Sequence, residues 1–429
     1  MKFLSRLFSL FSSSPTPAAS RAAPVACPAE RPPVPSRPRL FVGWEEMLDA
    51  QGAIAAYRLR PKSLQADAAI DGADLLAVLE QEGVRQMAER RPVIIPLSPG
   101  QWWGADFSVL ATGNSYVLPQ TATADFVEQL RVAGFKIAAE STQPEALATQ
   151  SPAPDLLIVD FHARPLAQIE AAVRTARQAC PKLLLAADKV GSWSEHRLAQ
   201  SLGFVFSLGG FAGTRDDADS GDRLTQSRLV IMDMQNQLRQ DAPLGELATT
   251  AKRDPAMVMT LLRMANSPLY GLSREIASLD DAIQLLGRDA LYRWLAVALF
   301  QVDARSGRDQ TLLVLALGRA RFLESLAVDR SKQQADELFL VGLLSLMEGL
   351  LGQPMLQLLS RLQLPDAVKA ALGQGEGPYA QYFSLVVAME QCDLLRASKL
   401  AAVLGIDMLE LVSRYGVAVQ WATSELRAA

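Results

Sequence analysis

The sequence predicts a protein of two halves, an α/β domain followed by an all-helical domain. From residue 40 to about 215, short apolar runs typical of strands alternate with helical patterns, which indicates a parallel sheet with crossover helices. From Leu224 to the C-terminus every strong signal is helical. An Asp-rich stretch between the halves is typical of a solvated linker. We therefore divide the chain into residues 1–39, 40–215, 216–223 and 224–429.

Composition places the chain among soluble proteins with well-developed cores. Of its 429 residues 49% are hydrophobic and 21% are charged. The longest apolar run, 338–351, is interrupted by Glu348 and is shorter than the roughly 20 residues of a membrane-spanning helix, so we predict a buried helix there. The three cysteines lie far apart, which predicts no disulfide framework and a cytoplasmic protein.

Charge is distributed unevenly. Residues 1–39 contain six basic side chains and one acidic side chain, a local charge of +5, so the remainder of this −4 chain carries −9. An acidic body argues against nonspecific nucleic-acid binding. Residues 12–38 are rich in Pro, Ala and Ser, and we expect a disordered, extended tether there.

The extreme N-terminus has an amphipathic pattern. Its apolar residues share one helical face: Phe3, Leu4, Leu7, Phe8 and Phe11. One interpretation is a short helix that docks on a membrane surface or a partner through residues 1–12. A frayed terminus is the second, because so short a helix is marginal in water. A secretory signal is the third, although a basic residue and three serines interrupt its apolar region.

Six strands and four helices are expected in the α/β half. The strands are 53–59, 93–97, 136–139, 156–161, 183–187 and 204–208. The helices are 73–90, 124–133, 166–180 and 194–202. Periodicity alone fits an open sheet and a barrel equally well.

The helical half contains a polar break at 263–272, between two helix signals. Asp254 precedes a proline as an N-cap does, Ser278 begins a capping-box pattern, and Gly287 marks a helix end before the apolar run 291–300. This order resembles the signature of the HDOD domain, an all-helical relative of the HD phosphohydrolases that lacks their metal-binding His-Asp core. The hallmark residues, which we interpret as structural, are Asn266, Ser267, Tyr270 and Gly271.

The histidine count agrees with that resemblance. Residues 223–429 contain no histidine, whereas an HD metal site needs several imidazoles. Met347 and Glu348 stand roughly where the His-Asp pair would be. His162 and His196 lie in the α/β half, and we expect both to be surface or capping residues.

The α/β half resembles the EAL fold, the barrel of cyclic di-GMP phosphodiesterases. Five segments carry the resemblance in the family's order: FVGWEEMLDAQGAIAAYRLR, RPVIIPLS, LRVAGFKIAAES, PDLLIVDF and LLLAADKVGSWSEHRLAQSLGFVFSLGGF. It is closest to the short EAL-like domain fused in front of HDOD domains. The resemblance implies an incomplete or degenerate TIM-barrel-like domain.

The resemblance also implies that the family's metal ligands are lost. Arg58 replaces the opening Glu, Pro96 replaces an Asn, the signature acid is absent from 116–119, paired aspartates become Ala139-Glu140, and the catalytic lysine becomes Ile158. Two divalent metals need carboxylate and amide oxygens, so we predict no catalytic, metal or cofactor residue.

Three residues remain near family positions, namely Asp160, Asp188 and Lys189. We interpret them as strand-end residues that cap helices or pair with one another. The alternative is a retained nucleotide pocket, in which Arg58 contacts phosphate.

We therefore expect a non-catalytic bacterial signalling protein that acts through contacts with other signalling proteins. The resemblance links it to cyclic di-GMP-type signalling, motility or stress regulation. The alternative is a catalytically dead cyclic di-GMP sensor. The adjacent Trp102 and Trp103 fit either a contact site or a loop that packs back onto the barrel.

Overall fold

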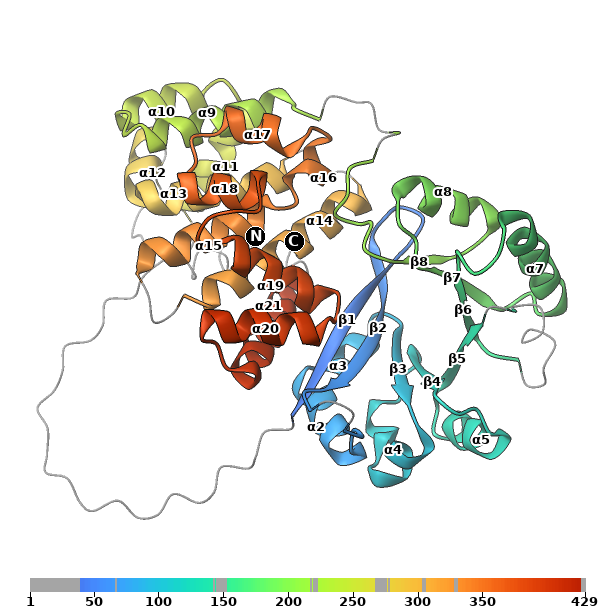
Figure 1. Cartoon of the computed structure of the whole chain (residues 1–429). Helices are drawn as coiled ribbons and strands as arrows, with labels where there is room; N and C mark the ends of the chain where they lie inside the picture. The colour runs from blue at the N-terminus through green and yellow to red at the C-terminus, as the bar shows by residue number, and fades with distance from the viewer. Residues whose placement is uncertain are drawn as a thin grey trace, which may run out of the picture.

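The computed structural model describes residues 39–65, 68–141, 143, 153–216, 218, 223–266, 276, 278–302, 306–327 and 331–425. Within these ranges the N-terminal half forms a closed barrel of eight strands, and the C-terminal half is helical throughout (Figure 1). The α/β and all-helical halves predicted from the sequence are both confirmed, and the sheet is a barrel rather than an open sheet.

The barrel strands follow one another around the ring in chain order. They are β1 (Leu40–Leu48), β2 (Ile54–Ser63), β3 (Val93–Leu97), β4 (Ser115–Pro119), β5 (Lys136–Ser141), β6 (Leu156–Asp160), β7 (Leu184–Asp188) and β8 (Phe206–Leu208). Strands β2 to β8 are parallel, whereas β1 runs antiparallel to both β2 and β8 and closes the ring. Periodicity missed β1, whose centre holds two adjacent glutamates, and the short β4.

Helices cover the outside of the barrel. They are α2 (Gly72–Gln81), α3 (Val84–Ala88), α4 (Pro99–Gly104), α5 (Ala124–Val132), α7 (Leu166–Ala179) and α8 (Trp193–Leu202), with a 3-10 helix at Phe107–Leu110. The single helix expected over 73–90 is wrong. Gly83 has φ +70°, a left-handed conformation that divides it into α2 and α3.

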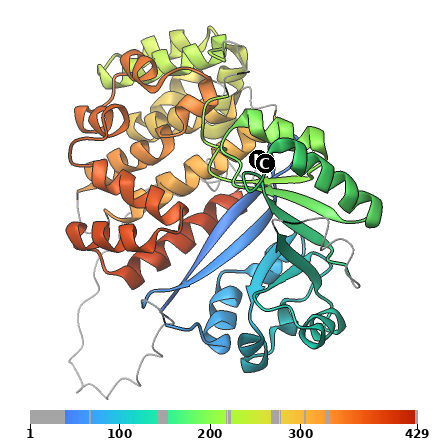
Figure 2. The same ribbon diagram turned by 45° about the vertical axis from the view of Figure 1, so that its right-hand side comes forward.

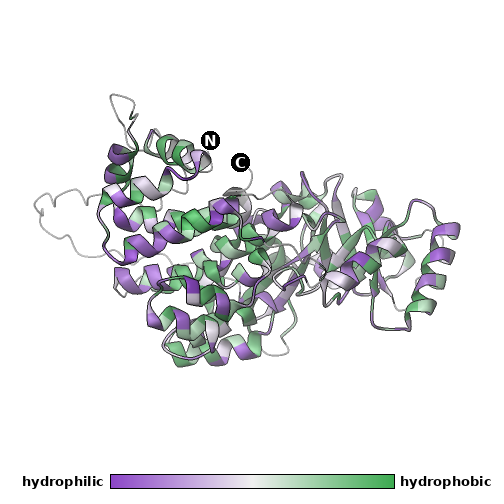
Figure 3. Ribbon diagram, turned by 90° about the horizontal axis from the view of Figure 1, so that it is seen from above, coloured by the Kyte–Doolittle hydropathy of each residue, from purple (hydrophilic) through white to green (hydrophobic). Residues whose placement is uncertain are grey.

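The helical half is built from α9 to α21. Their bounds are α9 (Gln226–Arg239), α10 (Leu244–Ala251), α11 (Pro255–Ala265), α12 (Leu279–Leu286), α13 (Arg288–Gln301), α14 (Gly307–Ser325), α15 (Lys332–Leu344), α16 (Met347–Leu351), α17 (Met355–Arg361), α18 (Asp366–Gly373), α19 (Ala380–Glu390), α20 (Leu394–Leu404) and α21 (Met408–Glu425). Many are striped in hydrophilic and hydrophobic colour, as expected for helices that bury one face (Figure 3). In the described part of the chain, no helix has the length and apolarity needed to cross a membrane.

The apolar run 338–351 is buried, as predicted, but it is not one helix. It is divided between α15 and α16 at Ser345, whose hydroxyl turns back to donate to the carbonyl of Gly342. Gly342 itself allows α15 to lie close to α14, because a Cβ there would be 2.5 Å from the backbone nitrogen of Ala320. A small residue at this crossing therefore sets the distance between two central helices.

The β1–β2 hairpin joins the two halves. Figures 1 and 2 both show it beside α19 and α21. At its turn, the Thr311 hydroxyl of α14 donates to the carbonyl of Gly52 and accepts from the backbone N–H of Ile54. Nearer the other end, Phe41 packs against Tyr415, with ring centroids 5.7 Å apart. The hairpin is thus part of the barrel wall and of the helical core at once.

Arg308 makes a second junction between the halves. Its guanidinium donates to the carbonyl of Gly349, lies 4.5 Å from the centre of the Trp193 ring and is 3.6 Å from Asp216. Asp216 also accepts hydrogen bonds from both terminal nitrogens of Arg197, and it is 8% exposed. The start of the expected solvated linker is therefore buried, because two arginines pair with it.

Candidate functional site

The floor of the barrel interior is apolar. Side chains of alternating strand positions form a buried cluster of Met47, Ala56, Ile94, Tyr116, Ala138, Leu156, Ile158, Ala186, Phe206 and Leu208. Two residues further toward the carboxyl end of each parallel strand, the next inward positions form a ring at the mouth. That ring contains Arg58, Pro96, Leu118, Glu140, Asp160 and Asp188, with Glu45 contributed by antiparallel β1.

Arg58 holds three carboxylates in this mouth. Its Nε donates to Glu45 Oε2 at 2.8 Å, and Nη1 donates to Glu140 Oε1 at 3.0 Å. Both terminal nitrogens donate to Asp188, each at 3.0 Å, in the bidentate geometry that favours arginine over lysine. We call Arg58, Glu45, Glu140 and Asp188 the Arg58 cluster.

Arg58 keeps its charge although it is largely sequestered from solvent. The Arg58 side chain is 9% exposed, and those of Asp188 and Glu45 are 16% and 21% exposed. Burial opposes the charge on Arg58, but the carboxylates of Glu45 and Asp188 outweigh that effect and raise its pKa. A buried guanidinium without such partners would be strongly unfavourable, so these acids are the reason that Arg58 is tolerated in the mouth.

Asp160 and Lys189 form a separate pair at the rim of the mouth. Lys189 Nζ is 2.7 Å from Asp160 Oδ2, and its hydrogen bond lowers the pKa of the aspartate. Lys189 has φ +61°, a conformation rare for a residue with a side chain, and its N–H donates to Asp188 Oδ1. The three retained positions therefore meet at the mouth, each with a partner.

The mouth does not fit a pair of divalent metals. The side chains of Pro96 and Leu118 in the mouth, and of Ile158 in the floor below it, offer no ligand atom. The carboxylates of the Arg58 cluster already surround a guanidinium. Within the described ranges, no group of three or more His, Cys, Asp or Glu side chains is arranged to hold a metal ion.

The two histidines have different environments. His162 is exposed, with Nε2 3.3 Å from Glu195, as expected. His196 is 2% exposed, so its expected surface position is wrong. It packs between Trp193 and Phe211, and its Nδ1 shares a 2.9 Å hydrogen bond with Ser207. Burial lowers its pKa.

Asn266 ties together the two ends of the HDOD-like break. Its amide nitrogen donates to the carbonyls of Leu262 and Ile276, and its amide oxygen accepts the N–H of Ile276 at 2.7 Å. These bonds satisfy backbone groups where α11 ends. The other hallmark positions lie outside the described residues: Ser267, Tyr270 and Gly271. Glu348, which the sequence resemblance places near the His-Asp position, accepts the backbone N–H of Met355.

The tryptophan pair separates into two roles. Trp102 packs against Phe107, Phe126 and Phe135, whereas Trp103 is 68% exposed. The packing interpretation is thus correct for the first tryptophan alone.

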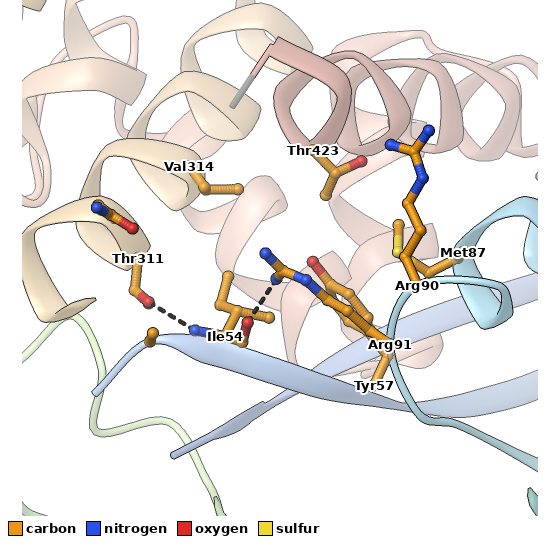
Figure 4. Close-up of a pocket in the computed structure, with 10 residues that line it drawn as sticks. Ile54, Tyr57, Met87, Arg90, Arg91, Thr311, Val314 and Thr423 are labelled. Atoms are coloured by element: carbon orange, nitrogen blue, oxygen red, sulfur yellow. Dashed lines mark hydrogen bonds between the residues drawn. The ribbon is translucent and has the colours of Figure 1, made fainter. Parts of the chain in front are cut away.

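A cavity of about 290 Å³ lies between β2 and helices α14 and α21 (Figure 4). The Arg91 guanidinium in it donates to the carbonyl of Ile54, and Thr311 bonds the N–H of the same residue. The Thr311 bond therefore joins the helical half to the barrel, whereas the Arg91 bond lies within the barrel half.

Sequence reasoning missed Glu45, which supplies the shortest ion pair to Arg58. The spacing of Glu45 from Met47 could have indicated its position, because residues two apart on a strand share a face and Met47 faces the barrel interior. The antiparallel direction of β1, which brings Glu45 to the mouth, is not visible in the sequence.

The fold and mouth define a closed barrel with a sequestered arginine, joined to a helical domain. The model of the HDOD domain matches residues 224–359, so the helical half contains an HDOD domain. The chain is 27% identical over 270 residues to the uncharacterised protein YuxH of Bacillus subtilis, covering 62% of this chain and 65% of YuxH. It is 26% identical over 237 residues to the cyclic di-GMP phosphodiesterase CdgJ of Vibrio cholerae, covering 55% and 54%. It therefore spans less than two thirds of either relative.

Among solved structures, the manganese and cyclic di-GMP complex of BlrP1 from Klebsiella pneumoniae resembles the chain at 17% identity. The match covers 41% of this chain and 55% of BlrP1, with a TM-score of 0.34.

Proposed function

We propose that this chain is a non-catalytic regulatory protein of cyclic di-GMP-type signalling and that it acts through contacts with other proteins. The HDOD match and the similarity to CdgJ support the signalling class. The Arg58 cluster supports the loss of catalysis, and it is the observation that carries the proposal.

The charge and geometry of the mouth oppose metal-dependent catalysis. A metal-dependent phosphodiesterase uses divalent cations to activate water and to stabilise charge on the phosphate. Here the guanidinium occupies the space between Glu45, Glu140 and Asp188 and takes up the oxygens that could ligate a cation. Arg58 cannot lose its proton at any physiological pH. A change of pH therefore cannot release the carboxylates of the mouth from its guanidinium.

The test is hydrolysis of cyclic di-GMP by the full chain with Mg²⁺ or Mn²⁺. The control is the Asp188→Asn variant, which lacks one acid of the mouth. We expect both proteins to show no turnover above buffer. Hydrolysis by the wild type that the Asp188→Asn variant lacks would overturn the proposal.

A cyclic di-GMP sensor without catalysis remains the competing function. In the structure the nitrogens of Arg58 are bonded to carboxylates, which leaves phosphate no unpaired guanidinium in the Arg58 cluster. Isothermal titration calorimetry separates the two functions. Saturable binding that Arg58→Met abolishes would favour the sensor, whereas no heat at saturating nucleotide favours the contact protein.

A further inference from the structure

A second cleft lies outside the barrel, between the β1 strand, helices α2 and α3, and helix α21. It has a volume of about 420 Å³, within the usual range of ligand sites. We call it the Trp44–Glu82 cleft, and its lining is mostly apolar, with Trp44, Met87, Val417, Val419 and Trp421. Trp44 is on the face of β1 opposite Glu45, so this cleft is separate from the mouth.

Glu82 gives the cleft its chemistry. It is the one ionisable side chain among the described residues that line the cleft. Trp44 Nε1 donates to Glu82 Oε2 at 2.6 Å, and in the described part of the chain no other hydrogen bond reaches this carboxylate. Burial raises the pKa of Glu82 to about 7. A carboxylate in a cleft that two tryptophans line, with one oxygen left without a hydrogen bond among the described residues, favours a cation that also brings apolar surface.

The chain itself carries a segment of that composition. Residues 2–11 combine Lys2 and Arg6 with phenylalanines and leucines, within an N-terminal region of charge +5 attached to a body of charge −9. The described structure begins at Arg39, and Trp44 follows the first residue of β1 by four positions, about 13 Å along a strand. The 33 residues from Arg6 to Arg39 reach up to roughly 100 Å, so length does not prevent contact.

We propose that the Trp44–Glu82 cleft binds residues 2–11 of the same chain, with Lys2 or Arg6 against Glu82 and the adjacent phenylalanines against the tryptophans. A tethered segment has an effective concentration in the millimolar range, so a modest affinity is enough to fill the cleft. The proposal concerns a surface outside the barrel mouth and does not depend on whether the barrel hydrolyses a nucleotide.

Zero-length carbodiimide cross-linking of the full chain tests the contact, because this reagent joins a carboxylate to an amine only when the two touch. The proteins are the wild type and an Arg6→Lys variant, which makes either cation reactive. We expect mass spectrometry to find an amide between Glu82 and Lys2 or the lysine introduced at position 6. Substitution of Phe3 and Phe8 by Ser should lower its yield roughly tenfold, the effect of about one lost contact of moderate strength.

The matched control is Glu80→Gln, which removes an exposed acid two residues away on α2 and should leave the Glu82 cross-link unchanged. Absence of any Glu82 cross-link in both proteins would overturn the proposal. So would a cross-link of equal yield after the phenylalanine substitutions, since the contact would then be nonspecific. A further contrary outcome is co-sedimentation of the chain with phosphatidylglycerol vesicles that needs residues 2–11 while no Glu82 cross-link forms without vesicles.

Discussion

Replacing Arg58 by methionine tests whether this arginine holds the barrel mouth together. The substitution keeps an unbranched apolar side chain in place of the arginine stem but removes the guanidinium from three carboxylates. The acids would then face one another without a cation. We expect the variant to fold with lower stability.

The solvent exposure of each carboxylate determines how much stability the Arg58→Met variant should lose. Removing one member of a fully buried ion pair costs about 3–5 kcal/mol, because the other charge stays buried and unpaired. The Glu140 side chain is 52% exposed, so its pair should contribute at most about 1 kcal/mol. Glu45 and Asp188 are 21% and 16% exposed and stay partly hydrated without Arg58. We therefore expect a total loss of about 3 kcal/mol, below the fully buried limit.

Urea unfolding followed by tryptophan fluorescence measures this loss. The matched control is Arg60→Met on the same strand, because Arg60 is 44% exposed and lies 3.8 Å from Glu45. We expect the control to change stability by less than about 0.5 kcal/mol. In the Asp188→Asn background, Arg58→Met should cost roughly half as much, since the two residues are coupled. Equal stability of the Arg58→Met and Arg60→Met proteins would refute the reasoning.

Three further predictions concern other parts of the molecule. Asn266→Ala should destabilise the helical half by about 1–2 kcal/mol in urea unfolding, because partly buried backbone groups lose their partners; an unchanged midpoint contradicts this. Burial lowers the pKa of His196 in the folded protein. As the pH falls, the imidazole is therefore protonated in the unfolded chain at a higher pH than in the folded protein, and stability should fall below about pH 6.5. The variant His196→Phe should lack that part of the pH dependence, and an identical pH profile would contradict the assignment. Gly342→Ala should cost about 2 kcal/mol or more by thermal unfolding, because its Cβ would press on the backbone of Ala320, whereas Gly318→Ala has room and serves as the control.

Local patterns in the sequence predicted the helices whose start or end is marked by capping residues or glycines close to the helix. The α5 helix begins after Thr123, whose hydroxyl accepts the N–H of Phe126, and Gly287 ends α12 with φ +73°. The division of 73–90 at Gly83 was missed, because a glycine within a helical pattern is compatible with either continuation or a break.

His196 shows why burial is harder to predict than an element. Its helix α8 was expected near the observed bounds, but the polar sequence around it favoured an exposed position. The aromatic rings of Trp193 and Phe211 close over it only when α8 packs on the barrel. The burial of His196 therefore depends on the packing of α8 on the barrel, and no local sequence pattern indicates that packing.

By itself the sequence determined which residue types stand at the positions that resemble the metal sites of the two families. Arg58, Pro96 and Ile158 stand at the EAL-like positions and no histidine follows residue 222, so the resemblance predicts that the metal ligands of both families are lost. Only the tertiary structure decided what the remaining charges do. Antiparallel β1 and parallel β7 bring Glu45 and Asp188 to the same guanidinium from positions 143 residues apart, and closure of the barrel makes that meeting possible.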